Sequence, residues 1–125
     1  MRTLIVVEDD PDVQLLLETI FSMDPRFDLA EVAVSAEDAL EMAQTMEPGI
    51  IVLDHGLAGA LTGLEAAPRL KERAPNSKII LFTAHAELKP RADQEPAIDA
   101  FLLKTKSTKL LALAQQLAGL DAPLP

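Results

Sequence analysis

The sequence predicts one α/β domain in which helices cover both faces of a parallel β-sheet. Short apolar runs rich in β-branched residues alternate five times with segments of helical character, and short connections join them. Two of these runs, residues 4–7 and 50–53, are apolar at every position, which is typical of strands buried on both faces. The 125 residues, 49% of them hydrophobic, are enough for the core of one domain.

The first expected strand, Leu4–Val7, stops at three consecutive carboxylates, residues 8–10. Asp10 followed by Pro11 is typical of a helix N-cap and its first helical position. The helix that follows has one continuous apolar face, made by Val13, Leu16, Leu17, Ile20 and Phe21. A weaker strand at Leu29–Val34 is interrupted by an acidic residue, which indicates a place near the edge of the sheet.

Ser35 begins a capping box for a second helix, whose apolar face comprises Ala36, Ala39, Leu40, Ala43 and Met46. The central strand, residues 50–53, then ends on Asp54. A glycine-containing loop, residues 56–63, leads to a third helix. Pro68 lies within this helix and indicates that its regular part begins late or is kinked, because proline removes an internal hydrogen bond.

The next buried strand, residues 78–83, ends on the hydroxyl of Thr83. The segment 84–96 contains two prolines and little apolar periodicity, so we expect only a short polar helix there. The last strand, residues 100–103, ends on Lys104.

Ser107 is placed to cap a final helix, whose core-facing residues are Leu110, Leu111, Ala114, Leu117 and Ala118. We therefore expect one domain over residues 1–119, a short tail at 120–125, and no output domain. Five strands in this alternation fit the flavodoxin-like strand order 2-1-3-4-5, with helices on both faces of the sheet.

In such a sheet the carboxyl ends of the strands share one edge, where ligands of open α/β folds bind. Four expected strands end there on chemically useful groups, namely Glu8 with Asp9, Asp54, Thr83 and Lys104. Three carboxylates in one cleft repel one another, and an oxygen-only ligand set favours a hard divalent cation such as Mg²⁺. A metal-bound carboxylate beside an ammonium and a hydroxyl suits phosphoryl transfer, with Asp54 as the nucleophile and an aspartyl phosphate as the product.

These residues resemble the response-regulator receiver domains of two-component signalling, the CheY-like family. The resemblance rests on four fragments in the right order on the right strands, residues 7–11, 53–54, 83–84 and 99–104. It covers nearly the whole chain, from residue 3 to about residue 119. The resemblance implies a signalling domain rather than an enzyme, with at most self-catalysed phosphorylation and autodephosphorylation.

The resemblance also implies a role for each site residue. Asp54 would accept the phosphoryl group from a histidine kinase or a histidine phosphotransfer protein. Asp9 would bind Mg²⁺ directly, Glu8 would act on the metal through water, and the main-chain carbonyl of Gly56 would be a further ligand. Lys104 would pair with the phosphoryl group. The phosphorylated domain would then switch partner binding or relay the phosphoryl group onward.

Further implied roles concern the switch and the lifetime of the phosphoryl group. Thr83 and Phe101 would form the switch pair, the hydroxyl moving toward the phosphate while the ring turns inward. His85 and Gly56 occupy positions that tune phosphoryl loss in the family. Thr105 stands where the family usually has a proline joined by a cis bond, so we expect a trans peptide bond here.

Composition excludes several other classes of function. Twenty acidic against eleven basic residues give a net charge of −9, which repels nucleic-acid backbones and anionic membranes. The absence of cysteine excludes a disulfide framework and a thiolate metal site. No apolar run is long enough for a signal peptide or a membrane span, so we expect a soluble cytoplasmic protein.

Three other functions compete with that of a phosphoacceptor. A hydrolase with an aspartate nucleophile would normally have a second acid two residues beyond it, where Gly56 stands. A flavin binder is disfavoured because the acids after the first strand repel phosphate. A receiver-like scaffold that acts through protein–protein interaction without phosphorylation is the strongest alternative. The Leu-rich segment 110–120 offers apolar surface for a weak homodimer.

Overall fold

The computed structural model describes residues 2–120 and has the predicted alternation of strands and helices. All five strands are parallel, in the order β2-β1-β3-β4-β5. Their bounds are β1 Arg2–Val7, β2 Phe27–Ala33, β3 Ile50–Leu53, β4 Lys78–Thr83 and β5 Ala100–Leu103. The predicted fold class and strand order are therefore confirmed.

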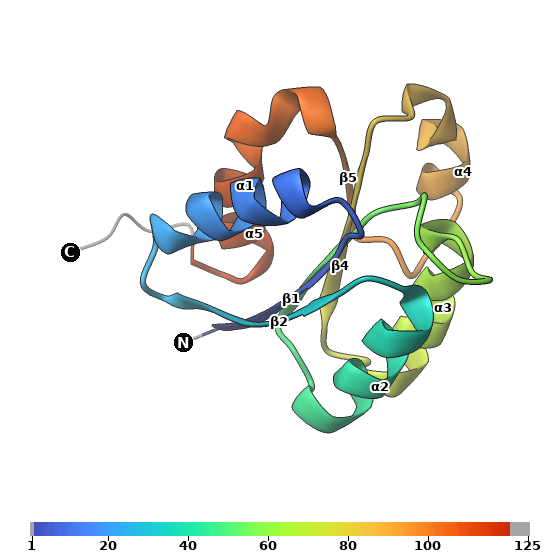
Figure 1. Cartoon of the computed structure of the whole chain (residues 1–125), viewed down its shortest axis with the longest axis horizontal. Coiled ribbons are helices and arrows are strands. Elements are labelled where there is room, and N and C mark those ends of the chain that lie inside the picture. Colours follow the sequence, from blue (N-terminus) through green and yellow to red (C-terminus); the bar gives the residue numbers. More distant parts are fainter. Residues whose placement is uncertain (1, 121–125) are drawn as a thin grey trace.

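Helices cover both faces of this sheet. Those on one face are α1 (Pro11–Ser22) and α5 (Leu110–Leu117), and those on the other are α2 (Ala36–Met46), α3 (Gly63–Arg73) and the five-residue α4 (Lys89–Asp93) (Figure 1). Two short 3₁₀ segments, η1 (Ala86–Leu88) and η2 (Lys104–Lys109), precede α4 and α5. Because α4 is this short, the prediction of little helix between residues 84 and 96 is confirmed.

The core is divided in two by the alternation of side chains along the strands. Even-numbered residues of β1, β3 and β4, such as Leu4 and Val52, pack against α1 and α5, whereas odd-numbered ones, such as Ile5 and Leu53, pack against α2 and α3. Every residue of β3 is buried. The apolar interior therefore leaves room for polar groups only where the strands end.

The start of α1 is formed by the cap that the sequence predicts. The carboxylate of Asp10 accepts a hydrogen bond from the backbone N–H of Asp12 at 2.9 Å, and Pro11 takes the first helical position. The apolar face is narrower than expected, because Leu16 is 41% exposed. The exposed large apolar side chains of α1 are Leu15, Leu16 and Met23 at its end, whereas most leucines of segment 110–120 are partly exposed.

The late start considered for α3 and the cap predicted at Ser107 are both wrong, for different physical reasons. The helix α3 begins at Gly63, before Pro68, because Thr62 and Glu65 form a complete capping box that fixes its first turn. Ser107 makes no capping hydrogen bond, because the non-helical residue within η2 is Lys106, and from Ser107 the backbone is helical and continues into α5 at Leu110. A residue inside a helical run lacks the extended conformation of an N-cap.

The strand β2 lies at the edge of the sheet, as its interruption by Glu31 predicts. Its register with β1 shifts between Leu4 and Ile5, which pair with Leu29 and Glu31 and leave Ala30 as the extra residue.

Within residues 2–120, no helix is long and apolar enough to cross a membrane. The peptide bond between Lys104 and Thr105 is trans, as expected, and so are the other described bonds.

A buried carboxylate ties the end of the sheet opposite the site to α5. Asp24, only 1% exposed, accepts hydrogen bonds from the guanidinium of Arg26 at 2.9 and 3.0 Å and from the side-chain amide of Gln115 at 3.0 Å. The hydrogen bonds from Arg26 hold the pKa of Asp24 well below its ordinary value, against the opposing effect of burial. The carboxylate therefore stabilises the fold in its charged form.

This arrangement predicts a pH-dependent loss of stability in Asp24→Asn. The folded-state pKa of Asp24 lies below its unfolded value of about 4, so its contribution is full above that pH and is lost as the pH falls below it. Urea unfolding should show a clear deficit in the variant at pH 7 that narrows steadily toward pH 3. Asp28→Asn, which removes an exposed carboxylate, should leave the unfolding free energy nearly unchanged. An equal Asp24→Asn deficit at both pH values would contradict the prediction.

Candidate functional site

The register of the sheet gathers four of the predicted site residues at one edge. The last residues of β1 and β3 are partners in the register, so Glu8 and Asp54, which follow them, lie side by side. The backbone N–H of Asp54 still donates to the last carbonyl of β1 at 3.0 Å. Thr83 is the last residue of β4, and Lys104 follows β5 directly. The edge predicted from the sequence is therefore the one that forms.

Lys104 joins the two buried carboxylates of this edge. Its ammonium nitrogen Nζ lies 2.8 Å from Oε1 of Glu8 and 3.1 Å from Oδ2 of Asp54. The side chains of Glu8 and Asp54 are only 2% and 9% exposed, and that of Lys104 is 22% exposed. Two carboxylates buried this deeply need a cation, because removing an unpaired charge from water costs on the order of several kcal/mol.

The pKa shifts follow from this burial and pairing. Burial raises the pKa of Glu8, and the nearby charge of Asp54 adds to the rise, while the contact with Lys104 opposes it. Burial lowers the pKa of Lys104, but its contacts with Glu8 and Asp54 outweigh this effect, and the net direction is upward. Lys104 is therefore held as an ammonium ion between the two carboxylates.

The acidic side chains form a group that fits a hard divalent cation. Glu8, Asp9 and Asp54 each offer a carboxylate oxygen, and these atoms lie within 4.8 Å of one another. Three carboxylates and one ammonium leave two formal negative charges. Oε1 of Glu8 is buried and has its ion pair with Lys104 but no hydrogen bond of normal geometry from any described residue. An oxygen-rich, negatively charged set with such an atom suits Mg²⁺ and its bound waters.

Backbone contacts at the start of α1 fix the position of Glu8. Its Oε2 accepts from the N–H of Asp10 at 3.2 Å, and its carbonyl accepts from the side-chain amide of Gln14 at 2.7 Å. Asp10 itself serves as the helix cap, as predicted, and Asp9 remains exposed to solvent. Sequence reasoning missed this contact of Gln14 with Glu8. The available signal was the position of Gln14, one turn after the N-cap.

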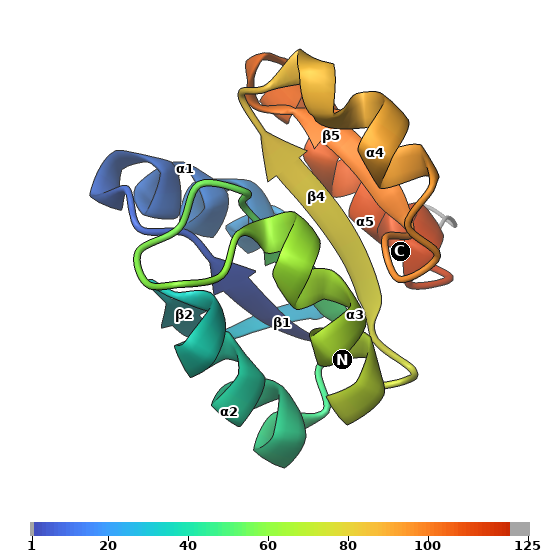
Figure 2. The same ribbon diagram turned by 90° about the vertical axis from the view of Figure 1, so that its right-hand side faces the viewer.

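The loop that follows Asp54 is held at its tip and at its end. Ala58 forms a parallel β-bridge with Ser35 at the start of α2, and the loop extends toward that helix (Figure 2). At the other end, the N–H of Gly63 donates to the carbonyl of His55 at 2.9 Å. A side chain at Gly63 would overlap the carbonyl group of Asp54. The first turn of α3 therefore packs directly on the backbone of the central acid.

Thr83 and Phe101 lie near this edge but take no part in the ion pairs of Lys104. Thr83 is fully buried, and its Oγ1 accepts from the N–H of His85 at 3.2 Å. Phe101 is half-buried and packs against the core shared with α2 and α3. Within residues 2–120, no hydrogen bond joins Thr83 to Asp54. Their predicted switch roles and the carbonyl role of Gly56, an exposed residue with open space around its Cα, stay predictions.

The two histidines differ in their surroundings. His85 is exposed, and its Nδ1 lies 3.2 Å from the carboxylate of Glu87. His55 is half-buried, and burial, followed by the electrostatic effects of Arg91 and His85, lowers the pKa of its ring. The ring of His55 is therefore neutral at pH 7, and its Nδ1 accepts from the N–H of Leu64 at 3.4 Å.

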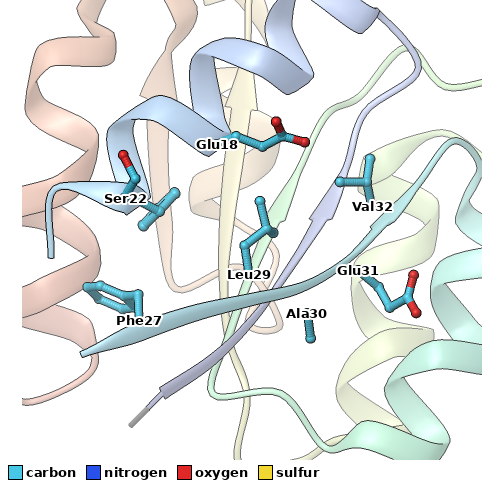
Figure 3. A pocket seen from close by; sticks show the side chains of 8 residues that line it. Glu18, Ser22, Phe27, Leu29, Ala30, Glu31 and Val32 are labelled. Atoms are coloured by element: carbon cyan, nitrogen blue, oxygen red, sulfur yellow. The ribbon is translucent and has the colours of Figure 1, made fainter. Parts of the chain in front are cut away.

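A surface hollow of about 490 Å³ lies away from these residues, between α1 and the edge strand β2 (Figure 3). Phe21, Phe27 and Leu29 provide apolar lining, and Glu18 and Glu31 are exposed carboxylates at its border. None of its lining residues is a buried polar group. The concentration of buried charge, rather than the size of a hollow, therefore locates the candidate site at Asp54.

The contact between Gly63 and Asp54 predicts that Gly63→Ala disturbs both the fold and the site. The added methyl group would overlap the Asp54 carbonyl, so the loop or α3 must move, at a cost of about 1–3 kcal/mol in unfolding free energy. Gly56→Ala is the matched control, because a Cβ there meets nothing within 4 Å. Chemical denaturation should separate the two variants, and equal unfolding free energies would contradict the prediction.

Comparison with known proteins identifies the family. The chain matches the response regulator receiver domain over residues 4–115. It is 30% identical to the nitrate/nitrite response regulator NarL of Escherichia coli K12 over 121 residues, which cover 94% of this chain and 55% of NarL. A protein-glutamate methylesterase/protein-glutamine glutaminase of Paramagnetospirillum magneticum is 38% identical over 77 residues, 62% of this chain and 22% of its own length.

Solved structures show the same fold. The response regulator TrrA of Thermotoga maritima, in complex with Mg²⁺ and BeF, superposes with a TM-score of 0.81 at 26% identity, over 94% of this chain and 99% of TrrA. The receiver domain of the putative response regulator NarL from Mycobacterium tuberculosis has a TM-score of 0.84 at 21% identity, over 94% and 96% of the two chains. Given its match over residues 4–115, this chain belongs to the response regulator receiver domain family.

Proposed function

We propose that the chain works as a phosphoacceptor switch that takes a phosphoryl group onto Asp54 from a histidine kinase or a histidine phosphotransfer protein. The observation that carries the proposal is the buried ion pair of Lys104 with Asp54 and Glu8. A carboxylate that served only the fold would gain little from sharing its cation with a second buried acid. Membership of the receiver family supports the same role.

In the proposed reaction, a carboxylate oxygen of Asp54 forms a bond to phosphorus while the bond from phosphorus to the donor histidine nitrogen breaks, and the imidazole takes up a proton. Lys104 offsets the negative charge that spreads over the phosphoryl oxygens, and the backbone N–H of His55, 2.8 Å from Oδ1, holds the Asp54 carboxylate. Glu8, Asp9 and Asp54, with the carbonyl of Gly56, would hold Mg²⁺. When bound, the cation supplies charge neutralisation at the same oxygens.

The switch that we propose runs from the phosphoryl group through Thr83. In the structure its Oγ1 accepts the N–H of His85, the residue directly before η1 in the loop after β4. A hydroxyl that turned toward a phosphoryl group on Asp54 would release that amide. The segment carrying η1 and α4 is short and rests on few backbone hydrogen bonds of its own, so its position responds to this release, with Phe101 filling the vacated space.

The chain spans about half the length of NarL and of other curated regulators that match most of this chain. We propose that the phosphorylated domain acts by changing its binding to a protein partner or by passing the phosphoryl group onward. A receiver-shaped scaffold without phosphorylation is the alternative. The completeness of the set formed by Asp9, Asp54 and Lys104 favours the phosphoacceptor.

Incubation with acetyl phosphate and Mg²⁺ tests the acceptor directly. Intact mass spectrometry should show the gain of one phosphoryl group by the wild type and none by Asp54→Ala, because the variant lacks the proposed nucleophile, which lies beside Lys104 within the acidic group. Chelation of Mg²⁺ should abolish the gain. Asp28→Ala removes an exposed carboxylate elsewhere and should behave as the wild type. Phosphoryl gain by Asp54→Ala would assign the acceptor to another residue.

Lys104→Met should change Mg²⁺ binding and phosphoryl gain in opposite directions. Lys104 competes with a cation for Glu8 and Asp54, so the loss of its positive charge should tighten Mg²⁺ binding several-fold. The same change should slow phosphoryl gain, because the ammonium no longer offsets charge on the phosphoryl oxygens. Asp9→Asn should weaken Mg²⁺ binding and slow phosphoryl gain together. Calorimetric titration measures the affinities, and weaker binding by Lys104→Met would contradict the prediction.

A further inference from the structure

The first turn of α3 has all three of its leading N–H groups satisfied, two of them by a single residue. The N–H of Gly63 donates to the carbonyl of His55 at 2.9 Å, and the N–H of Leu64 donates to Nδ1 of the same histidine at 3.4 Å. The third, from Glu65, donates to the hydroxyl of Thr62. The first N–H groups of a helix have no acceptor within the helix, so acceptors from outside it must bind them. The N-terminal end of α3 is thus hydrogen-bonded to both the backbone carbonyl and the ring of His55.

His55 is also bonded to the acid that precedes it. Its backbone N–H donates to Oδ1 of Asp54 at 2.8 Å, which leaves Oδ2 for Lys104. The ring of His55 is half-buried against the start of α3. A change in the backbone angles of His55 would therefore move the N–H that orients Asp54, and the bond from the ring to Leu64 resists that change.

We propose that His55 is a positioning residue, whose ring fixes the backbone that orients the Asp54 carboxylate. The inference rests on the proposed function of Asp54 as the phosphoacceptor and assigns to this chain's histidine a role in that reaction. Residues 56–62 are held by the bridge between Ser35 and Ala58, by the packing of Leu57 and Leu61 on the core and by the hydrogen bond from the N–H of Thr62 to Glu65, and none of these contacts involves His55. The ring accepts through Nδ1 and takes no part in proton transfer.

The test compares His55→Leu with His55→Asn. In His55→Leu the leucine fills a similar volume but has no acceptor, so the backbone N–H of Leu64 loses its partner. In His55→Asn the asparagine presents an oxygen near the position of Nδ1. The initial rate of phosphoryl gain from acetyl phosphate with Mg²⁺ should fall about five-fold in His55→Leu, the factor expected for one hydrogen bond. It should stay within about two-fold of the wild type in His55→Asn. The loss should appear in the maximal rate constant of phosphoryl gain rather than in the acetyl phosphate concentration that gives half of it, because the ring orients the nucleophile and does not bind the donor.

Thr62→Ala separates positioning from simple loss of helix stability. It removes the cap of the same helix end without touching residues 54 and 55, at a typical cost of about 1 kcal/mol. Below its unfolding transition it should gain phosphoryl groups at the wild-type rate. An equal fall in Thr62→Ala and His55→Leu, or an equal fall in His55→Asn and His55→Leu, would overturn the proposal.

Two further measurements keep the proposal testable if His55→Leu does not fold or if Asp54 takes no phosphoryl group. Hydrogen exchange in the wild type should show the Leu64 amide protected as strongly as the Glu65 amide, and a freely exchanging Leu64 amide would overturn the contact. The Mg²⁺ affinity should be several-fold weaker in His55→Leu than in His55→Asn. Unchanged affinity would overturn the positioning role, whereas a wild type that gains no phosphoryl group refutes the proposed function alone.

Discussion

The structure depends on one ammonium ion shared by two buried carboxylates. Lys104 stands between Glu8 and Asp54, and each of the three comes from the end of a different strand. In the parallel register β1 and β3 end at the same level and β5 runs two residues further, so the long side chain of Lys104 reaches back to both carboxylates. The apolar halves of the core on the two faces of the sheet set that register. Packing and charge are thus consistent with a single arrangement of the strand ends.

Sequence reasoning predicted the sheet order and the edge at which the charges meet, because both follow from patterns along the chain. Apolar runs such as 50–53 are distinctive, and a parallel sheet with short connections brings their ends together. The place of Lys104 at the same edge as Asp54 followed from the alternation of strands and helices, whereas its ion pair with the carboxylates was not predicted. Asp10 was assigned to capping correctly, because the cap depends only on the residues next to it.

What sequence reasoning missed depends on contacts across space or on competition between local signals. Pro68 suggested a late start for α3, but the capping box of Thr62 and Glu65 outweighed it. Ser107 had the chemistry of a cap, yet the non-helical residue of η2 is Lys106, one position before it. The bond from the ring of His55 to Leu64 joins residues nine apart through a loop, and no periodic pattern marks it. Thr83 and Phe101 were placed near the edge, and nothing in the sequence fixes which way they face.

The register shift in β2 has a consequence for how the protein behaves at high concentration. An edge strand with evenly spaced free N–H and C=O groups is a template on which another chain can add a strand, and such edges promote aggregation. The extra residue Ala30 breaks that even spacing halfway along the strand, and the exposed carboxylates of Asp28 and Glu31 place like charges along the same edge. A second copy of this acidic chain would meet both obstacles. The edge is thereby protected against strand addition by irregularity and by charge repulsion.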